Sequence, residues 1–314
     1  VAIDGRDLHW ANPQPDAPVE SFTVQLAFAG AGTAEAPGGS GSLIVTPVGG
    51  SIGDLVGDAD LRWQFAGGLL NATAFLPKLR TWAQATAEPR APYTFRGLAA
   101  VSALDVQPFL LTVGALPDAI SGTVGLSAMF EGRLDDVSTA QAFLNLQDIE
   151  LSVGGLPVAL DRPARVTVRA DDFSVDDLSL TAGRTTLAVA GRFHDTTERP
   201  LRASLTGVLS DVLALAHAFG ATPDGISATG AIRATWESRG GLDRAQSTVA
   251  IADGTVTAAG LPPVESLNTT ATFDGATLEV DRFAAAWQGA AIEGRATLPR
   301  AVLEATADAP ARSP

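Results

Sequence analysis

The sequence predicts an all-β fold made of meandering antiparallel strands with a few short amphipathic helices. Two observations lead to this fold class: apolar and polar residues alternate along most of the chain, and turn-forming pairs interrupt the alternation at short intervals. A third observation is that short phrases recur about one hundred residues apart, which indicates a fold built from repeats.

The alternation is clearest at residues 22–28, where every even position is apolar. This period of two is typical of a strand with one buried face. Further alternating segments lie around Val124, Val166, Leu187, Ile232 and Leu278. The predicted turns between strands include Gly154-Gly155, Asp171-Asp172, Asp253-Gly254 and Asp274-Gly275.

Three segments depart from the alternation and are predicted to be short amphipathic helices. Residues 209–220 carry Ser210 and Asp211 near the start, apolar residues at helical spacing, and Gly220 at the end. Residues 105–113 and 75–87 are the other two predicted helices, the latter because Leu79 and Trp82 are spaced for one helix face.

Recurring phrases divide the chain into repeats. Pro-Asp-Ala-Ile-Ser at residues 117–121 returns as Pro-Asp-Gly-Ile-Ser at 223–227, and Gly-Leu-Pro at 155–157 returns at 260–262. We therefore expect a first, less regular repeat at residues 1–97, a second at 98–200, a third at 201–300, and a flexible tail at 301–314.

Composition limits the possible partners. The 21 basic and 35 acidic side chains give a net charge of −14, which disfavours nucleic acid as a partner. Without cysteine the chain has no disulfides, thiolate metal sites or cysteine nucleophile. Hydrophobic residues make up 46% of the chain but aromatic residues only 6%, so it offers much smooth apolar surface and few large side chains to fill a core.

The ends of the chain predict that it is a piece of a longer protein. It begins at Val1 without an initiator methionine or a signal-like segment, and it ends in a loose stretch rich in Ala and Pro. It contains no run of about 18 apolar residues of the kind that spans a bilayer as a helix.

The repeat pattern resembles that of the AsmA-like/TamB superfamily. A short helix is followed by alternating strands marked by Gly-Leu-Pro and closed by phrases such as Leu-Ala-Val-Ala-Gly-Arg-Phe at 187–193 and Ala-Ile-Glu-Gly-Arg-Ala-Thr-Leu at 291–298. The likeness covers residues 98–300 well and 1–97 loosely. It implies an elongated, curved antiparallel sheet, a repeating β-groove whose concave side is apolar and open along one edge.

The same resemblance implies a function. Members of this superfamily are anchored in the bacterial inner membrane, cross the periplasm and carry phospholipid towards the outer envelope. We therefore expect a periplasmic segment of a bridge-like lipid transport protein, with phospholipid as ligand and inner- and outer-membrane proteins as partners at the two ends. The chain departs from the family in lacking the N-terminal anchor and a recognisable C-terminal module.

The apolar residues of period-two strands share one face, and something must cover that face. The shortage of aromatics favours a groove in which acyl chains form part of the cover, each CH₂ gaining about 0.8 kcal/mol on leaving water. Phe130 and Trp236 end equivalent strands of two repeats, and they are as well suited to filling the groove as to touching lipid. The predicted lipid-binding floor comprises Val124, Leu126, Phe130, Val166, Val168, Leu187, Val189, Ile232, Trp236, Leu278 and Val280.

We expect no enzyme activity, no cofactor and no metal site. Residues 49–53 spell G-x-S-x-G, but glycines and strand-like alternation follow, which favours a hairpin over a hydrolase elbow. The three histidines are scattered and do not form a metal-ligand pattern. The acid pairs fit solvated turns better than a calcium loop, and they are Asp135-Asp136, Asp171-Asp172 and Asp176-Asp177.

A second hypothesis remains open at this stage. A structural or adhesive extracellular array of tandem β-sandwiches, or a β-solenoid, would have the same strands and acidity. It predicts a closed core without bound lipid, whereas the groove predicts an apolar face that the chain itself leaves uncovered.

Overall fold

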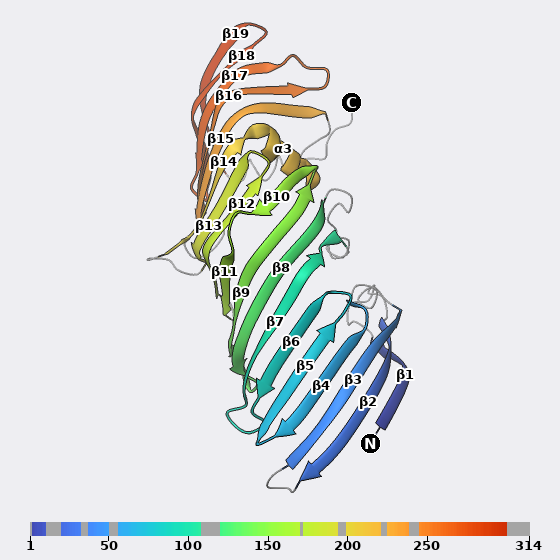
Figure 1. Cartoon of the computed structure of the whole chain (residues 1–314). Coiled ribbons are helices and arrows are strands. Elements are labelled where there is room, and N and C mark those ends of the chain that lie inside the picture. The colour runs from blue at the N-terminus through green and yellow to red at the C-terminus, as the bar shows by residue number, and fades with distance from the viewer. Residues whose placement is uncertain are drawn as a thin grey trace. The chain divides into compact units, whose positions relative to one another are not determined.

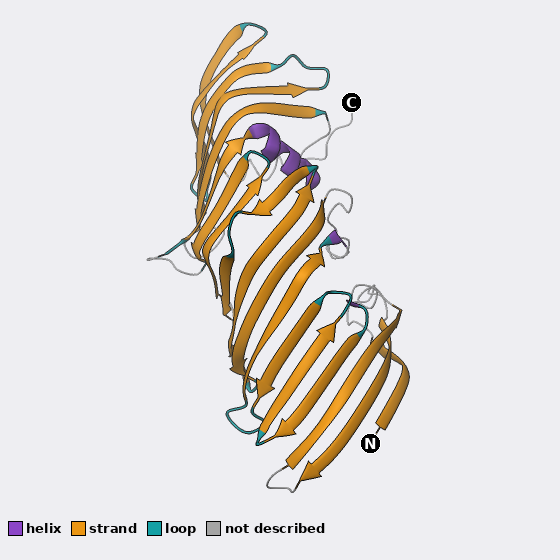
Figure 2. Cartoon of the chain, in the orientation of Figure 1, coloured by secondary structure: helices purple, strands orange, loops and turns teal. Residues whose placement is uncertain are grey.

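The structure is a computed structural model and is almost wholly β (Figures 1 and 2). It describes residues 2–10, 20–32, 37–49, 56–107, 120–169, 172–193, 199–220, 225–238 and 245–299. These ranges contain nineteen strands and the helix α3, Leu209–Ala218. The predicted all-β fold class, with antiparallel strands and a short helix, is confirmed.

The chain forms two compact units. Unit 1 comprises residues 1–114, 122–149 and 165–171, and unit 2 comprises 115–121, 150–164 and 172–314. Strands β8 and β9 each contribute to both. The strands labelled in Figure 1 are β1 Ala2–Trp10, β2 Glu20–Gly32, β3 Pro37–Gly49, β4 Ala59–Ala66, β5 Leu69–Leu76, β6 Thr81–Ala87, β7 Thr94–Asp105, β8 Ile120–Arg133, β9 Asp136–Val153, β10 Leu156–Leu160, β11 Ala164–Arg169, β12 Asp172–Ala182, β13 Thr185–Arg192, β14 Leu201–Val208, β15 Ile226–Ser238, β16 Ala245–Ala258, β17 Val264–Phe273, β18 Thr277–Trp287 and β19 Ala290–Pro299.

Neighbouring strands in the sequence are neighbours in each sheet. In unit 1 every strand from β1 to β8 pairs antiparallel with the next one. In unit 2 the end of β9 pairs with β10, β10 pairs with β12, and β12 to β19 follow in order. The unit boundaries differ from the predicted repeat boundaries, but compactness and sequence recurrence are different properties, so the three repeats stay a prediction.

The helix predictions had three different outcomes. The helix expected at 209–220 is confirmed as α3, and Gly220 just beyond its end has φ +68°, the left-handed conformation typical of a helix terminus. The helix expected at 105–113 falls largely outside the described residues. The helix expected at 75–87 is wrong: these residues form the end of β5, a turn and β6.

Two predicted turns are confirmed and two are wrong. Gly154-Gly155 joins β9 to β10, and Asp274-Gly275 joins β17 to β18. Asp253-Gly254 instead lies within β16, and Asp176-Asp177 lies within β12, each at a shift in pairing register. An extra residue in one strand produces such a bulge, so a polar pair there breaks the alternation without ending the strand. Of the predicted turn Asp171-Asp172, only Asp172 is described, at the start of β12.

Bulges recur along the sheets. Register shifts interrupt the pairing of β7 with β8, β15 with β16, β17 with β18 and β18 with β19. Ala103, Asp253 and Ser266 lie at such shifts with φ of 53°, 50° and 52°. Bulges bend a strand and increase its twist. The long strands of unit 2 accordingly bend along their length (Figure 1).

Candidate functional site

One face of unit 2 is apolar across eight strands. In antiparallel pairing, residues directly opposite one another point to the same side of the sheet. Residues that are paired from strand to strand therefore form a row across one face of the sheet. We name two adjacent rows of unit 2 the unit-2 floor, and fifteen of its sixteen positions are apolar. From β12 to β19 the first row is Leu180, Leu187, Leu205, Ala234, Val249, Ala271, Val280 and Ala296, and the second is Leu178, Val189, Ala203, Trp236, Ser247, Phe273, Leu278 and Leu298.

The described part of the chain does not seal the unit-2 floor. All sixteen residues are half-buried except Ala296, which is exposed. In a sandwich a second sheet packs on such a face and its side chains become fully buried. The fully buried residues of this face lie instead towards the strand ends, for example Val175, Leu201 and Ala245 at one end and Ala182 and Ile232 at the other. The middle of the face therefore keeps apolar surface accessible.

Helix α3 covers one end of this face. It contacts β10, β14 and β15, and Figure 2 shows it beside the ends of these strands. Asp211 fixes its position: the carboxylate, 6% exposed, accepts hydrogen bonds from the backbone N–H of Arg184 at 2.7 Å and from the Thr185 hydroxyl at 3.4 Å. Thr185 is 2% exposed and its hydroxyl also accepts from the backbone N–H of Val208 at 3.2 Å. The first turn of α3 is thus fastened to the turn between β12 and β13.

Unit 1 carries an equivalent face, which we name the unit-1 floor. Three rows of paired residues cross β2 to β8, and each of their 21 positions is apolar or glycine. Nineteen are half-buried, while Phe28 and Gly30 are exposed. The rows are Leu26, Leu43, Leu61, Ala74, Ala83, Ala99, Ala128; Phe28, Gly41, Trp63, Ala72, Ala85, Gly97, Phe130; and Gly30, Gly39, Phe65, Leu70, Ala87, Phe95, Gly132.

The predicted floor residues of unit 2 all lie on its apolar face. Leu187, Val189, Trp236, Leu278 and Val280 belong to the unit-2 floor itself. Ile232 lies on the same side, next to α3, and is fully buried at 8% exposure. The predicted floor omitted Leu178, Leu180, Leu205, Val249 and Phe273. Polar residues flank all of them on both sides except Val249, which is followed by Ala250.

The predicted floor residues of unit 1 also share one side. Phe130 belongs to the unit-1 floor, and Val124 and Leu126 lie on the same side of β8. On β11, Arg169 donates a hydrogen bond to Gln141, and Gln141 donates to Glu131 on the polar side of β8. Alternation along β11 then places Val166 and Val168 on the floor side. Val168 is exposed and Val166 is half-buried.

The opposite face of unit 2 is polar. The row that alternates with the floor is Ser179, Ala188, Ser204, Thr235, Thr248, Thr272, Glu279 and Thr297, and seven of its eight residues are polar. The Ser179 and Thr181 hydroxyls donate hydrogen bonds to Asp161 and hold the pKa of that carboxyl below its ordinary value. Charged and hydroxyl groups on this face keep it hydrated.

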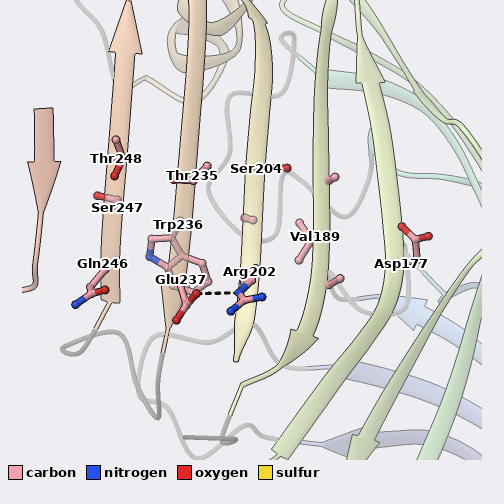
Figure 3. A pocket seen from close by; sticks show the side chains of 13 residues that line it. Asp177, Val189, Arg202, Ser204, Thr235, Trp236, Glu237, Gln246, Ser247 and Thr248 are labelled. Atoms are coloured by element: carbon pink, nitrogen blue, oxygen red, sulfur yellow. Dashed lines mark hydrogen bonds and ion pairs between the residues drawn. The ribbon is translucent and has the colours of Figure 1, made fainter. Parts of the chain in front are cut away.

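A hollow of about 410 Å³ lies on this polar face between β12 and β16 (Figure 3). Arg202 and Glu237 form an ion pair of 2.8 Å across it, as the dashed line shows. Because the Arg202 side chain is 65% exposed, the pair adds little stability. Val189, Ala203, Trp236 and Ser247 of the floor also border the hollow.

The opposite face of unit 1 is mixed. It carries polar residues such as Arg62 and Gln84, but also the exposed apolar side chains of Phe75, Trp82 and Met129. Phe75 and Trp82 pair directly across β5 and β6. The unit-1 floor therefore differs from the opposite face in having only apolar residues and glycines, nineteen of its 21 positions being half-buried. The opposite face can serve as an internal control.

The residues considered for other chemistry have various locations. Of residues 49–53 only Gly49 is described, at the end of β3, so the predicted hairpin there lies outside the described residues. His217 lies in α3, His9 lies in β1 and His194 is not described. Asp135 lies in the turn from β8 to β9 and pairs with Arg133, and Asp177 pairs with Arg162. In the part of the chain that the structure describes, no three acidic or histidine side chains are grouped as a metal site would need.

No family model, curated protein or solved structure matches the chain. Within the described ranges, no helix has the length and apolar character needed to cross a bilayer.

Proposed function

We propose that this chain is a periplasmic segment of a bridge-like lipid transport protein, in which the two floors shield phospholipid acyl chains from water. The observation that carries the proposal is the unit-2 floor: fifteen apolar residues in paired rows, none of them fully buried. An apolar surface of this extent is unusual on a soluble monomer unless something binds there.

The size of the floors suits an acyl chain. At about 4.8 Å between strands, a row from β12 to β19 is roughly 34 Å long and one from β2 to β8 roughly 29 Å. A lipid tail spans about 15 Å, half the thickness of a bilayer core. Each floor is thus longer than the tail it would hold.

Energetics favour retention together with movement along the floor. Each buried CH₂ contributes about 0.8 kcal/mol, so a two-tailed lipid is held by well over ten kcal/mol in gross terms. Along a row of Leu, Val and Ala this energy changes little with position. Escape into water is then costly whereas sliding is not. The polar face opposite would remain in water, with the lipid head group at the open edge.

We propose that the full-length protein is anchored in the inner membrane and that inner- and outer-membrane proteins are its partners at the two ends. The competing function is a structural β-repeat array that binds no lipid. Solvent extraction of the protein purified from bacteria, followed by mass spectrometry, separates the two: phospholipid in the extract supports transport, and a lipid-free, cooperatively folded protein supports the array.

Tryptophan fluorescence tests which face holds the lipid. Trp63 lies on the unit-1 floor, Trp236 on the unit-2 floor, and Trp82 on the opposite face of unit 1, where it is 44% exposed. Each variant retains one of these three tryptophans and has phenylalanine at the other four tryptophan positions of the chain. Phosphatidylcholine with brominated acyl chains should quench the fluorescence of Trp63 and Trp236 more than that of Trp82. Stronger quenching of Trp82 would refute the assignment of the floors.

A further inference from the structure

Glycines of the unit-1 floor lie beneath aromatic rings of the neighbouring strands. A Cβ atom at Gly41 would lie 2.2 Å from Cζ2 of Trp63, and one at Gly97 would lie 2.4 Å from Cζ of Phe130. Real Cβ atoms essentially never come within 3.0 Å of another heavy atom in this way. The rings of Trp63 and Phe130 therefore occupy the space that a side chain at the paired position would need.

The same arrangement recurs in weaker form at a third and a fourth position. A Cβ atom at Gly132 would lie 3.1 Å from Cζ of Phe95, and one at Gly39 would lie 3.2 Å from Cε2 of Phe28. The side chains of a strand ordinarily stand roughly perpendicular to the sheet. A ring that extends over the backbone of the next strand rises less above the sheet than a ring that stands perpendicular to it. The floor is therefore lower where these rings lie.

The unit-2 floor lacks this arrangement. None of its sixteen residues is glycine, and Trp236 pairs with Ala203 and Ser247. In the unit-1 floor, Trp63 and Phe130 are paired with glycines, whereas Trp236 of the unit-2 floor is paired with residues that have side chains.

We infer that Gly41 and Gly97 are positioning residues that set how far the rings of Trp63 and Phe130 rise above the unit-1 floor. By leaving room for Trp63 and Phe130 to lie low, they keep space above the floor for unbranched acyl chains. This inference rests on the proposed function, and it assigns the two glycines a role through the rings rather than through contact with lipid.

The test is to replace Gly97 by alanine and measure local lipid capture. The full chain is incubated with phosphatidylcholine vesicles carrying a diazirine in one acyl chain, irradiated, and digested for mass spectrometry. The readout is the crosslink yield in β7 and β8 divided by that in β15 and β16. Raising Phe130 displaces the acyl chain, and the ratio should fall about fourfold for each methylene contact that is lost.

A double variant separates the ring from the backbone. A Cβ atom at Gly97 would also lie 2.6 Å from the carbonyl oxygen of Gln84, so Gly97→Ala strains the sheet as well as the ring. The double variant Gly97→Ala with Phe130→Ala retains the clash with the Gln84 carbonyl and removes the clash with the Phe130 ring. The inference expects the capture ratio to return towards that of the wild type. A double variant that stays as low as the single one would overturn it.

Two further outcomes keep the inferences distinguishable. If the wild type captures no lipid on either floor, the proposed function fails. If the wild type captures lipid and Gly97→Ala leaves the ratio unchanged, only the role of the glycine fails. Should Gly97→Ala not fold, Gly41→Ala tests the same arrangement beneath Trp63. The crosslink yield in β3 and β4, divided by that in β15 and β16, should then fall about fourfold for each methylene contact that is lost, and an unchanged ratio would contradict the inference.

Discussion

Replacement of Asp211 by alanine tests how α3 is held over the end of the apolar face of unit 2. The carboxylate is 6% exposed and accepts hydrogen bonds from the Arg184 backbone N–H and the Thr185 hydroxyl. A hydrogen bond to a charged group stabilises by about 1.5–3 kcal/mol, and a buried donor left without a partner adds a cost of similar size. A loss of about 2 kcal/mol from local stability corresponds to an about 30-fold larger equilibrium constant for opening of the helix.

Hydrogen exchange measured by mass spectrometry on peptides that cover α3 is the appropriate assay, because it reports local opening. Asp211→Ala should exchange about 30-fold faster there, while β4 to β6 of unit 1 exchange as before. Asp211→Asn retains an acceptor oxygen for the Arg184 N–H, and a loss of about 1 kcal/mol predicts about fivefold. Unchanged protection of α3 in Asp211→Ala would show that apolar packing alone holds the helix.

Two further predictions concern neighbouring residues and pH. Ala234→Glu places a charge on the unit-2 floor and should reduce lipid capture, whereas Thr235→Glu, one residue along on the polar face, should not; equal losses in photocrosslinking would contradict the assignment of faces. Backbone N–H groups of Ala276 and Thr277 donate to Asp274 and lower its pKa from 3.8, so this turn is stabilised above about pH 4 and the stabilisation is lost as pH falls further. The difference in thermal unfolding between wild type and Asp274→Ala should therefore shrink in acid, and a difference that grew would refute the reasoning.

Alternation of apolar and polar residues predicted both the strands and the residues that share one face. Side chains of a strand point to opposite faces in turn, so the period of two that identifies a strand also assigns its residues to faces. It failed at residues 75–87, where Leu79 and Trp82 have helical spacing. The backbone N–H of Arg80 donates to the carbonyl of Pro77 in a turn, with φ of Arg80 at +48°, and Thr81 begins β6. Ala-rich β6 pairs along its whole length with β5 and β7, and this pairing outweighs the weak local preference for helix.

Bulges, long-range contacts and the glycines beneath aromatic rings could not be predicted from the local sequence pattern. Bulges such as the one at Asp253-Gly254 shift the phase of alternation inside a strand, so the sequence resembles a turn although the pairing continues. The contact between Asp211 and Thr185 joins residues 26 positions apart, and only the folded sheet brings them together. Gly41 and Gly97 lie in β3 and β7, which were not predicted as strands. Glycine within a strand often marks a close approach of another group, but that signal is available only once the strand is known.

The strand order has a consequence for how such a chain can change in length. From β1 to β8 and again from β12 to β19, each strand bonds only to its immediate predecessor and successor in the sequence among these strands. Insertion of one more hairpin would thus extend the ladder by two strands, about 10 Å, without breaking any other pairing. Evolution can adjust the span of a protein built in this way by duplication of hairpins, independently of the chemistry of its surface.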